Sequence, residues 1–176
     1  MTVFEAIEER YSYREAYRDT KVPRTDLLKI MEAGLAAPSG CNAQTTYIIG
    51  IDDPELLGKA AELLERPSFA LLSAGICVIT HAIPSYRNTY FNIQDYSAAI
   101  ENMLLAITGL GYSSCWIEGE ITTEKELQMT FAKMLAIPDG YAVVAFLPIG
   151  VPAMKGKRAI HKPFGERAFF NGFGKN

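Results

Sequence analysis

The sequence has few of the residues on which metal and thiol chemistry depends. Its 176 residues include two histidines, His81 and His161, and three cysteines, Cys41, Cys77 and Cys115. The cysteines are odd in number and widely spaced, so neither a disulfide framework nor a CxxC metal site is indicated. Two histidines are also too few to favour a metal-dependent hydrolase. We therefore expect no bound metal.

Positive charge and long apolar runs are scarce as well. The net charge is −3, whereas affinity for a phosphate backbone needs a cationic surface. No apolar run approaches the ~20 residues of a membrane-spanning helix, and residues 1–5 lack the pattern of a signal peptide. We expect a cytoplasmic protein that binds neither nucleic acid nor membranes.

The length and the hydrophobic content of 49% suit one globular domain over residues 1–176. Thr2 and Glu5 have the spacing of a capping box at the start of a short helix, and Thr123 and Glu126 have that of a second. The patterns predict further helices over 27–35, 54–64, 95–110 and 123–135, and strands over 44–51, 76–80, 113–117 and 141–150. This order of elements favours a single α+β domain.

The segment after Val151 is rich in glycine and lysine and ends in an aromatic group, Phe169, Phe170 and Phe173. A monomer would expose much apolar area there. We expect this tail to pack either on its own core or on a second subunit.

Arg10, Ser12 and Arg14 form the first candidate binding element. Two guanidinium groups and a hydroxyl can bind a phosphate, because arginine forks match phosphate oxygens bidentately. The alternative is a solvated loop with surface ion pairs to neighbouring glutamates.

Two further segments combine turn residues with polar groups. Residues 37–44 supply Ser39, Asn42 and Gln44, which could contact the edge of a heterocycle. Alternatively, these side chains satisfy the backbone of a loop after a helix. Residues 111–119 have glycine at both ends, which would let backbone amides approach a planar ligand. The alternative there is a core tryptophan beside a small buried cysteine.

Taken in order, four elements resemble the nitroreductase family of FMN-dependent oxidoreductases over nearly the whole chain. They are Arg-x-Ser-x-Arg at 10–14, Ala-Pro-Ser-x-x-Asn-x-Gln at 37–44, and a helix with Asn-x-Leu-Leu-Ala and Leu-Gly followed by Cys-Trp-Ile. The fourth is a closing strand, 145–152, with Gly-x-Pro.

The resemblance implies an α+β fold with a central mixed or antiparallel sheet of about four to five strands flanked by helices. It also implies an intertwined homodimer with exchanged terminal segments and a flavin site in the interface. The implied FMN-binding residues are Arg10, Tyr11, Ser12, Arg14, Pro38, Ser39, Asn42, Gln44, Cys115, Trp116, Ile117, Gly119, Arg158 and His161. Of these, Arg10, Ser12 and Arg14 would hold the phosphate and ribityl chain. Pro38, Ser39 and Asn42 would come from the other subunit, with Gln44 near the flavin, and the backbone of 116–119 would face the ring.

The chain departs from the family pattern in its tail. Family members often carry Lys or Arg two and four residues before a proline, whereas His161 and Ala159 precede Pro163 here. The third phosphate ligand is therefore open between Arg158 and His161, and we favour Arg158. The chain is also short, which leaves residues 84–91 as the best candidate for a lid.

In this interpretation the flavin carries the chemistry and no side chain acts as a catalytic group. No Gly-x-Gly-x-x-Gly follows a strand, so NADH or NADPH would bind transiently at the flavin. It would then leave before a nitroaromatic, quinone or other small acceptor bound, which is a ping-pong cycle. The alternatives are a flavin-binding protein without turnover, and a flavoenzyme of the same fold that fragments flavin or removes halogen.

Overall fold

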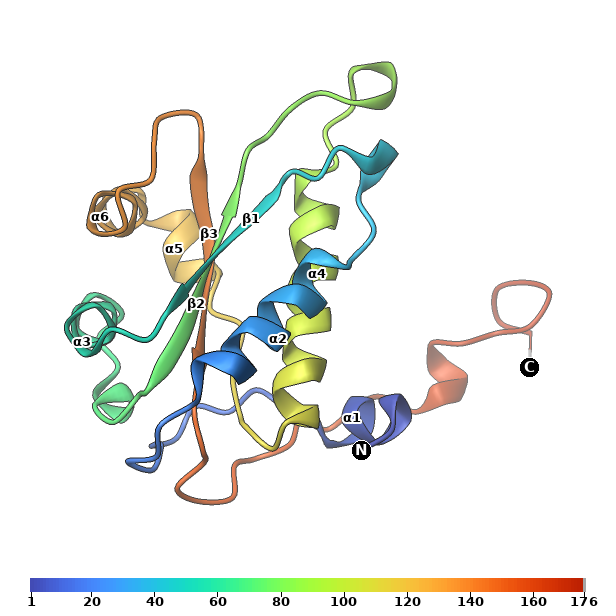
Figure 1. Cartoon of the computed structure of the whole chain (residues 1–176). Helices are drawn as coiled ribbons and strands as arrows, with labels where there is room; N and C mark the ends of the chain where they lie inside the picture. Colours follow the sequence, from blue (N-terminus) through green and yellow to red (C-terminus); the bar gives the residue numbers. More distant parts are fainter. Residues whose placement is uncertain (176) are drawn as a thin grey trace.

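A computed structural model describes residues 1–175, which form a three-stranded antiparallel sheet between two layers of helices (Figure 1). The strands are β1 (Thr46–Ile51), β2 (Ala74–Thr80) and β3 (Ala142–Ile149), in the order β1-β2-β3. Every residue of the central strand β2 is buried, which accounts for its continuous apolar sequence. The predicted α+β class is confirmed, with three strands instead of four to five.

Helices cover both faces of this sheet (Figure 1). They are α1 (Val3–Glu9), α2 (Arg24–Leu35), α3 (Pro54–Leu63), α4 (Asn92–Gly109), α5 (Gly119–Thr123) and α6 (Lys125–Met134). Alternate residues of β2 face opposite layers. Ile76 and Val78 join the core beneath α2 and α4, whereas Cys77 and Ile79 join the core beneath α3, α5 and α6. The short helix α1 packs against α4.

The predicted helix boundaries agree with the structure to within three residues. The capping box at α1 is confirmed, because Thr2 Oγ1 accepts from the Glu5 N–H at 3.3 Å and Glu5 Oε2 accepts from the Thr2 N–H at 2.7 Å. Helix α4 begins at Asn92, slightly before the predicted Asp95.

Two local predictions were wrong. Residues 113–117 form no strand. Instead, Ser113 and Ile117 make isolated antiparallel bridges to Gly150 and Phe146, and Ser114 makes one to Ser12. Residues 113–117 therefore run beside the end of β3, but Pro148, which lies opposite the middle of this segment, has no N–H to donate and the ladder is interrupted there,.

The second capping box is also absent. Thr123 is the last residue of α5, and its hydroxyl donates to the Gly119 carbonyl at 2.5 Å. Its side chain is therefore not available to cap α6.

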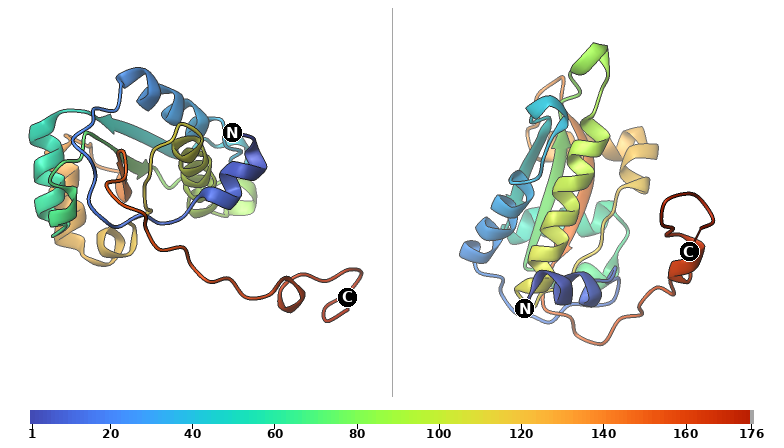
Figure 2. Two further views of the ribbon diagram at one scale, coloured as in Figure 1. Left: turned by 90° about the horizontal axis from the view of Figure 1, so that it is seen from below. Right: turned by 90° about the vertical axis from the view of Figure 1, so that its right-hand side faces the viewer.

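The tail extends away from the body of the chain (Figures 1 and 2). Ile160, Phe164 and Phe173 are 101%, 74% and 94% exposed. Phe169 packs on Phe173, with 4.9 Å between ring centroids. Of the two predicted arrangements, packing of the tail on its own core is therefore wrong.

Candidate functional site

A cavity of about 600 Å³ brings the two ends of the chain together. We call it the arginine cavity. It is lined by Glu8, Arg10, Tyr11, Ser12, Arg14, Lys157, Arg158, Ala159 and His161. The predicted Arg-x-Ser-x-Arg element and both candidate tail ligands thus surround one space. Neither Arg158 nor His161 is excluded by position.

The tyrosines that flank Ser12 connect the arginine loop to the start of the tail. The Tyr13 hydroxyl donates to the Ala16 carbonyl at 2.5 Å and accepts from the Ala153 N–H at 3.1 Å. The Tyr11 hydroxyl accepts from the Gly156 N–H at 3.3 Å. The sequence analysis assigned no role to Tyr13, because its partners lie at the far end of the chain.

The arginines of this cavity have only weak partners. Arg10 Nε lies 3.3 Å from Glu101 Oε1, and Arg158 pairs with Glu9. Arg14 donates to the Ser12 carbonyl at 3.4 Å. The two ion pairs are partly or largely open to solvent, where such pairs contribute little,. A guanidinium has five N–H groups, so each arginine keeps donors for an anion.

A smaller cavity of about 200 Å³ lies beside the Cys-Trp-Ile segment, and we call it the tryptophan cavity. It is lined by Arg14, Arg66, Phe69, Cys115, Trp116, Ile117, Glu118, Gly119 and Glu120. Arg14 therefore lines both cavities. Arg66, which pairs with Glu120, is not among the predicted site residues. An arginine outside the motifs gives no signal for such a position.

The backbone of the tryptophan cavity has free space and free donors. A Cβ added to Gly119 would meet no atom within 4 Å. The N–H groups of Glu118 and Gly119 donate to no acceptor within residues 1–175. In the same part of the chain, the buried Trp116 Nε1 also has no hydrogen-bond partner. A planar ligand with acceptor atoms would suit this surface.

Two neighbouring groups are structural. Cys115 is 3% exposed, and burial raises the pKa of its thiol to about 11, so it is an uncharged part of the core near neutral pH. The Tyr96 hydroxyl donates to Glu118 Oε1 at 2.7 Å. Burial and this carboxylate raise the pKa of Tyr96. Tyr96 thereby fixes the residue before Gly119.

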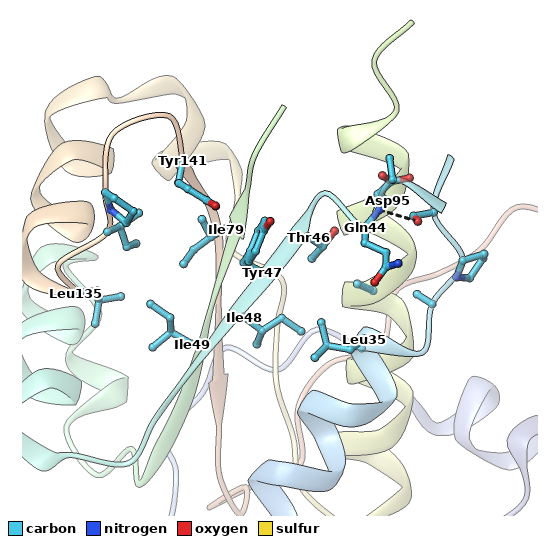
Figure 3. A pocket seen from close by; sticks show the side chains of 18 of the residues that line it. Leu35, Gln44, Thr46, Tyr47, Ile48, Ile49, Ile79, Asp95, Leu135 and Tyr141 are labelled. Atoms are coloured by element: carbon cyan, nitrogen blue, oxygen red, sulfur yellow. Dashed lines mark hydrogen bonds between the residues drawn. The ribbon is translucent and has the colours of Figure 1, made fainter. Parts of the chain in front are cut away.

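The loop over residues 39–44 lies elsewhere. Pro38, Ser39 and Gln44 line the largest cavity, about 770 Å³, beside the edge strand β1 (Figure 3). Its other walls are mainly apolar and include Leu35, Ile48, Ile49, Ile137 and Tyr141. Within residues 1–175 this cavity shares no lining residue with the arginine or tryptophan cavity. Asn42 is exposed on the same loop. Within one chain, the predicted binding residues therefore lie in two separate groups, one at the arginine and tryptophan cavities and one at the loop over residues 39–44.

Two further observations concern residues 1–175 as a whole. No helix formed by them has both the length and the apolar character that a membrane crossing requires. No group of three His, Cys, Asp or Glu side chains among them is placed to hold a metal ion.

Known proteins match this chain along most of its length. The family model "Nitroreductase family" matches residues 7–67 and 57–151. A protein of Archaeoglobus fulgidus, provisionally named an NADH dehydrogenase/NAD(P)H nitroreductase, is 30% identical over 138 residues, which cover 77% of this chain and 78% of the relative.

Solved structures agree. One from Parabacteroides distasonis, with the same provisional name, has a TM-score of 0.82 at 26% identity and covers 97% of this chain and 98% of its own. An FMN-dependent nitroreductase of Clostridium difficile has a TM-score of 0.79 at 25% identity and covers 97% and 99%. The motifs, the fold and these matches agree, and the chain belongs to the nitroreductase family of oxidoreductases.

Proposed function

We propose that this oxidoreductase binds FMN noncovalently, with the phosphate in the arginine cavity and the flavin ring in the tryptophan cavity. The observation that carries the proposal is the position of Arg14, which lines both spaces. A ligand with an anionic end and a planar end could occupy them together. The structural neighbour from C. difficile is described as FMN-dependent, which supports this choice of ligand.

The residues of the arginine cavity fit a phosphate. Arg10 and Arg14 offer charge-assisted donors and Ser12 offers a hydroxyl,. We propose Arg158 as the third ligand, because its side chain is already oriented by the Glu8 carbonyl at 3.1 Å and lies 6.0 Å from the Tyr11 ring centroid. His161 lines the same space and is the alternative.

The residues of the tryptophan cavity fit the edge of a flavin. Ile117 is held to Phe146 of β3 by hydrogen bonds in both directions, at 3.2 and 2.9 Å. This fixes the backbone just before the free N–H groups of Glu118 and Gly119, which would donate to ring acceptors. Bound flavin supplies the electron-transfer chemistry. The chain binds it, orients it and excludes water from it.

We propose further that the active unit is a homodimer in which each flavin site is shared. Pro38, Ser39, Asn42 and Gln44 would then reach the flavin of the partner subunit. The exposed tail and the edge strand β1 support this arrangement. Within residues 1–175, β1 pairs with β2 alone, so its outer backbone groups lack a strand partner there. An apolar cavity lies beside it, and the tail of a second copy offers apolar side chains to cover it.

For turnover, we propose that NADH or NADPH delivers electrons, leaves, and is replaced by a small acceptor such as a nitroaromatic or a quinone. The loop 84–91, our candidate lid, leads into the first turn of α4 (Figure 1). The relatives' names include NADH dehydrogenase and NAD(P)H nitroreductase, which supports a nicotinamide donor.

The test uses the purified full chain. We expect the yellow colour of bound flavin and release of FMN on denaturation. NADH or NADPH alone should bleach the flavin, and a quinone or nitroaromatic should restore its colour. Initial rates at several acceptor concentrations should give parallel double-reciprocal lines. Protein that neither contains nor takes up FMN would contradict the proposal. Flavin that both nicotinamides leave oxidised would favour flavin binding without turnover.

A further inference from the structure

The loop over residues 39–44 has an unusual backbone. Cys41, Asn42 and Gln44 have φ values of 53°, 56° and 50°. This left-handed region is costly for residues with a Cβ atom, although asparagine tolerates it better than most. Such a conformation persists only where the surroundings impose it. Some group in the fold must therefore hold this loop.

Asp95, in the first turn of α4, holds both ends of the loop. Its Oδ1 accepts from the Gly40 N–H at 2.7 Å, and its Oδ2 accepts from the Thr45 hydroxyl at 2.6 Å. Gly40 lies just before the left-handed segment and Thr45 just after it. Asp95 and Thr45 are 4% and 2% exposed. Figure 3 shows Asp95 beside Gln44 at the wall of the large cavity.

The surrounding contacts reinforce this clamp. A Cβ on Gly40 would lie 2.5 Å from Phe91, so the chain before α4 presses directly on the loop. The Thr45 carbonyl accepts from the His81 N–H at 2.9 Å and from the Thr80 hydroxyl at 3.3 Å. The Gln44 N–H donates to Ser39 Oγ at 3.0 Å. The ends of the loop are thus fixed while its middle, with Asn42, is exposed to solvent.

We infer that Asp95 is a positioning residue for flavin binding: it holds Gly40 and Thr45 so that Ser39 and Asn42 are presented in one conformation. This inference rests on the proposed function, in which that loop contacts FMN. Asp95 itself does not touch the ligand. It reduces the ordering that binding would otherwise have to bring about, and such preorganisation strengthens affinity.

The test compares Asp95→Asn with the wild-type chain. The amide keeps the size of the side chain but has one oxygen, so it cannot accept both hydrogen bonds. We expect the Kd for FMN to rise roughly tenfold or more, as for loss of a buried hydrogen bond to a charged group. The Kd for riboflavin should rise by the same factor, because in the proposed site this loop contacts the neutral part of the ligand and not its phosphate. Asp26→Asn is the matched control. It alters a carboxylate that accepts from the Tyr112 hydroxyl at 2.9 Å outside the site, and the Kd should stay unchanged.

A double-mutant cycle separates positioning from a general loss of structure. If Asp95 acts through the loop, adding Asn42→Ala to Asp95→Asn should weaken binding by less than the product of the two single effects. The inference would be overturned if the double variant raised the Kd by the full product of the two single effects, or if Asp95→Asn bound FMN with wild-type affinity. If Asp95→Asn does not fold, Thr45→Val, which removes one of the two hydrogen bonds, decides by the same criteria. Failure of the wild-type chain to bind FMN would instead remove the proposed function.

Discussion

The arginine cavity and the loop over residues 39–44 are built in opposite ways. The arginine cavity joins two segments from opposite ends of the chain, and its cations have exposed, weak partners. The loop is local in sequence and fixed at both ends by a buried carboxylate. One region can bind by charge, and the other by a preset shape.

This difference separates two contributions to binding. Charge attraction depends on the phosphate of the ligand and weakens with salt. A preset loop depends on neither, because it would contact the neutral part of the ligand. If each region serves a different subunit of a dimer, every flavin site combines both contributions.

The largest expected effect comes from removing the tail, which in the proposed dimer would help to bring the two regions together in one flavin site. Deletion of residues 165–176 should dissociate the dimer and abolish FMN binding together, because one interface would form both. Light scattering and flavin content measure the two losses. Phe170→Ser with Phe173→Ser keeps the length and should weaken the dimer in the same direction. A truncated chain that stays a monomer and binds FMN normally would contradict the shared site.

Arg14→Ala should disable the charge-based region. Loss of its bonds to phosphate should weaken FMN binding by about 1.5–3 kcal/mol. Riboflavin, which has no phosphate, should bind with unchanged affinity, and the salt dependence of FMN binding should decrease. Arg10→Ala should behave in the same way.

Arg24→Ala provides the control for these arginine variants. Its guanidinium pairs with Asp52 at 2.6 Å, away from both cavities, so FMN affinity should not change. Equal losses of FMN and riboflavin in Arg14→Ala would mean that Arg14 supports the fold and not the phosphate.

Asn42 tests the shape-based region and should show the opposite pattern. Asn42→Ala should weaken FMN and riboflavin equally, by about 0.5–1.5 kcal/mol for a lost hydrogen bond. Asn42→Gly removes the same side chain but tolerates the φ of 56°,. A loss in the alanine variant alone would indicate that conformation matters and contact does not. Selective loss of FMN would contradict the division between the regions.

The smallest expected effect concerns the reactivity of the three cysteines, of which Cys41 lies in the loop over residues 39–44. Exposed Cys41 should react with a thiol reagent in the native protein, whereas Cys115 and Cys77 should not, because burial raises the pKa of their thiols to about 11 and about 12. Raising the pH from 7 to 9 should not make Cys115 or Cys77 reactive, because their thiols stay protonated over this range. Cys41→Ser should remove the fast reaction, and FMN should slow it in the wild-type chain. Rapid labelling of more than one cysteine would contradict this assignment.

Ionisation of the buried Cys115 and Cys77 thiols should destabilise the fold at alkaline pH. Their folded-state pKa values lie above the ordinary value of 9.0. The thiolate is therefore favoured in the unfolded chain, and the stability is complete below pH 9 and is lost as the pH rises through about 11 for Cys115. Cys115→Ala should show a smaller loss over this range in thermal unfolding measured against pH.

Sequence patterns correctly predicted two elements that depend on residues close together in the chain. The capping box of Thr2 and Glu5 and the continuous apolar run of β2 need only a few adjacent residues. The predicted strand at 113–117 is interrupted opposite Pro148 of β3, a distant residue that no pattern within the segment identifies. Within the site, the arginine motif was visible, but its union with residues 157–161 depends on Tyr11 and Tyr13 contacting the far end of the chain.

The sequence pattern indicates for Asp95 only a place at the start of a predicted helix. An acidic residue in a first helical turn is ordinary, because it interacts well with the helix dipole. Its role as a clamp appears only when Gly40 and Thr45 are seen to approach it from another segment. The separation of the binding residues into two groups was likewise implied by the family resemblance alone, since composition and spacing do not distinguish one subunit from two.

The shared flavin site is tested most directly with hybrid dimers of two defective subunits. One subunit carries Arg10→Ala and Arg14→Ala, and the other carries Asn42→Ala and Asp95→Asn. In a shared arrangement, one of the two sites of the hybrid collects all four defects and the other collects none. Titration with FMN should therefore find one site of wild-type affinity per hybrid dimer, although neither parent has any. A hybrid with two weakened sites and none of wild-type affinity would show that each flavin site is built from a single chain.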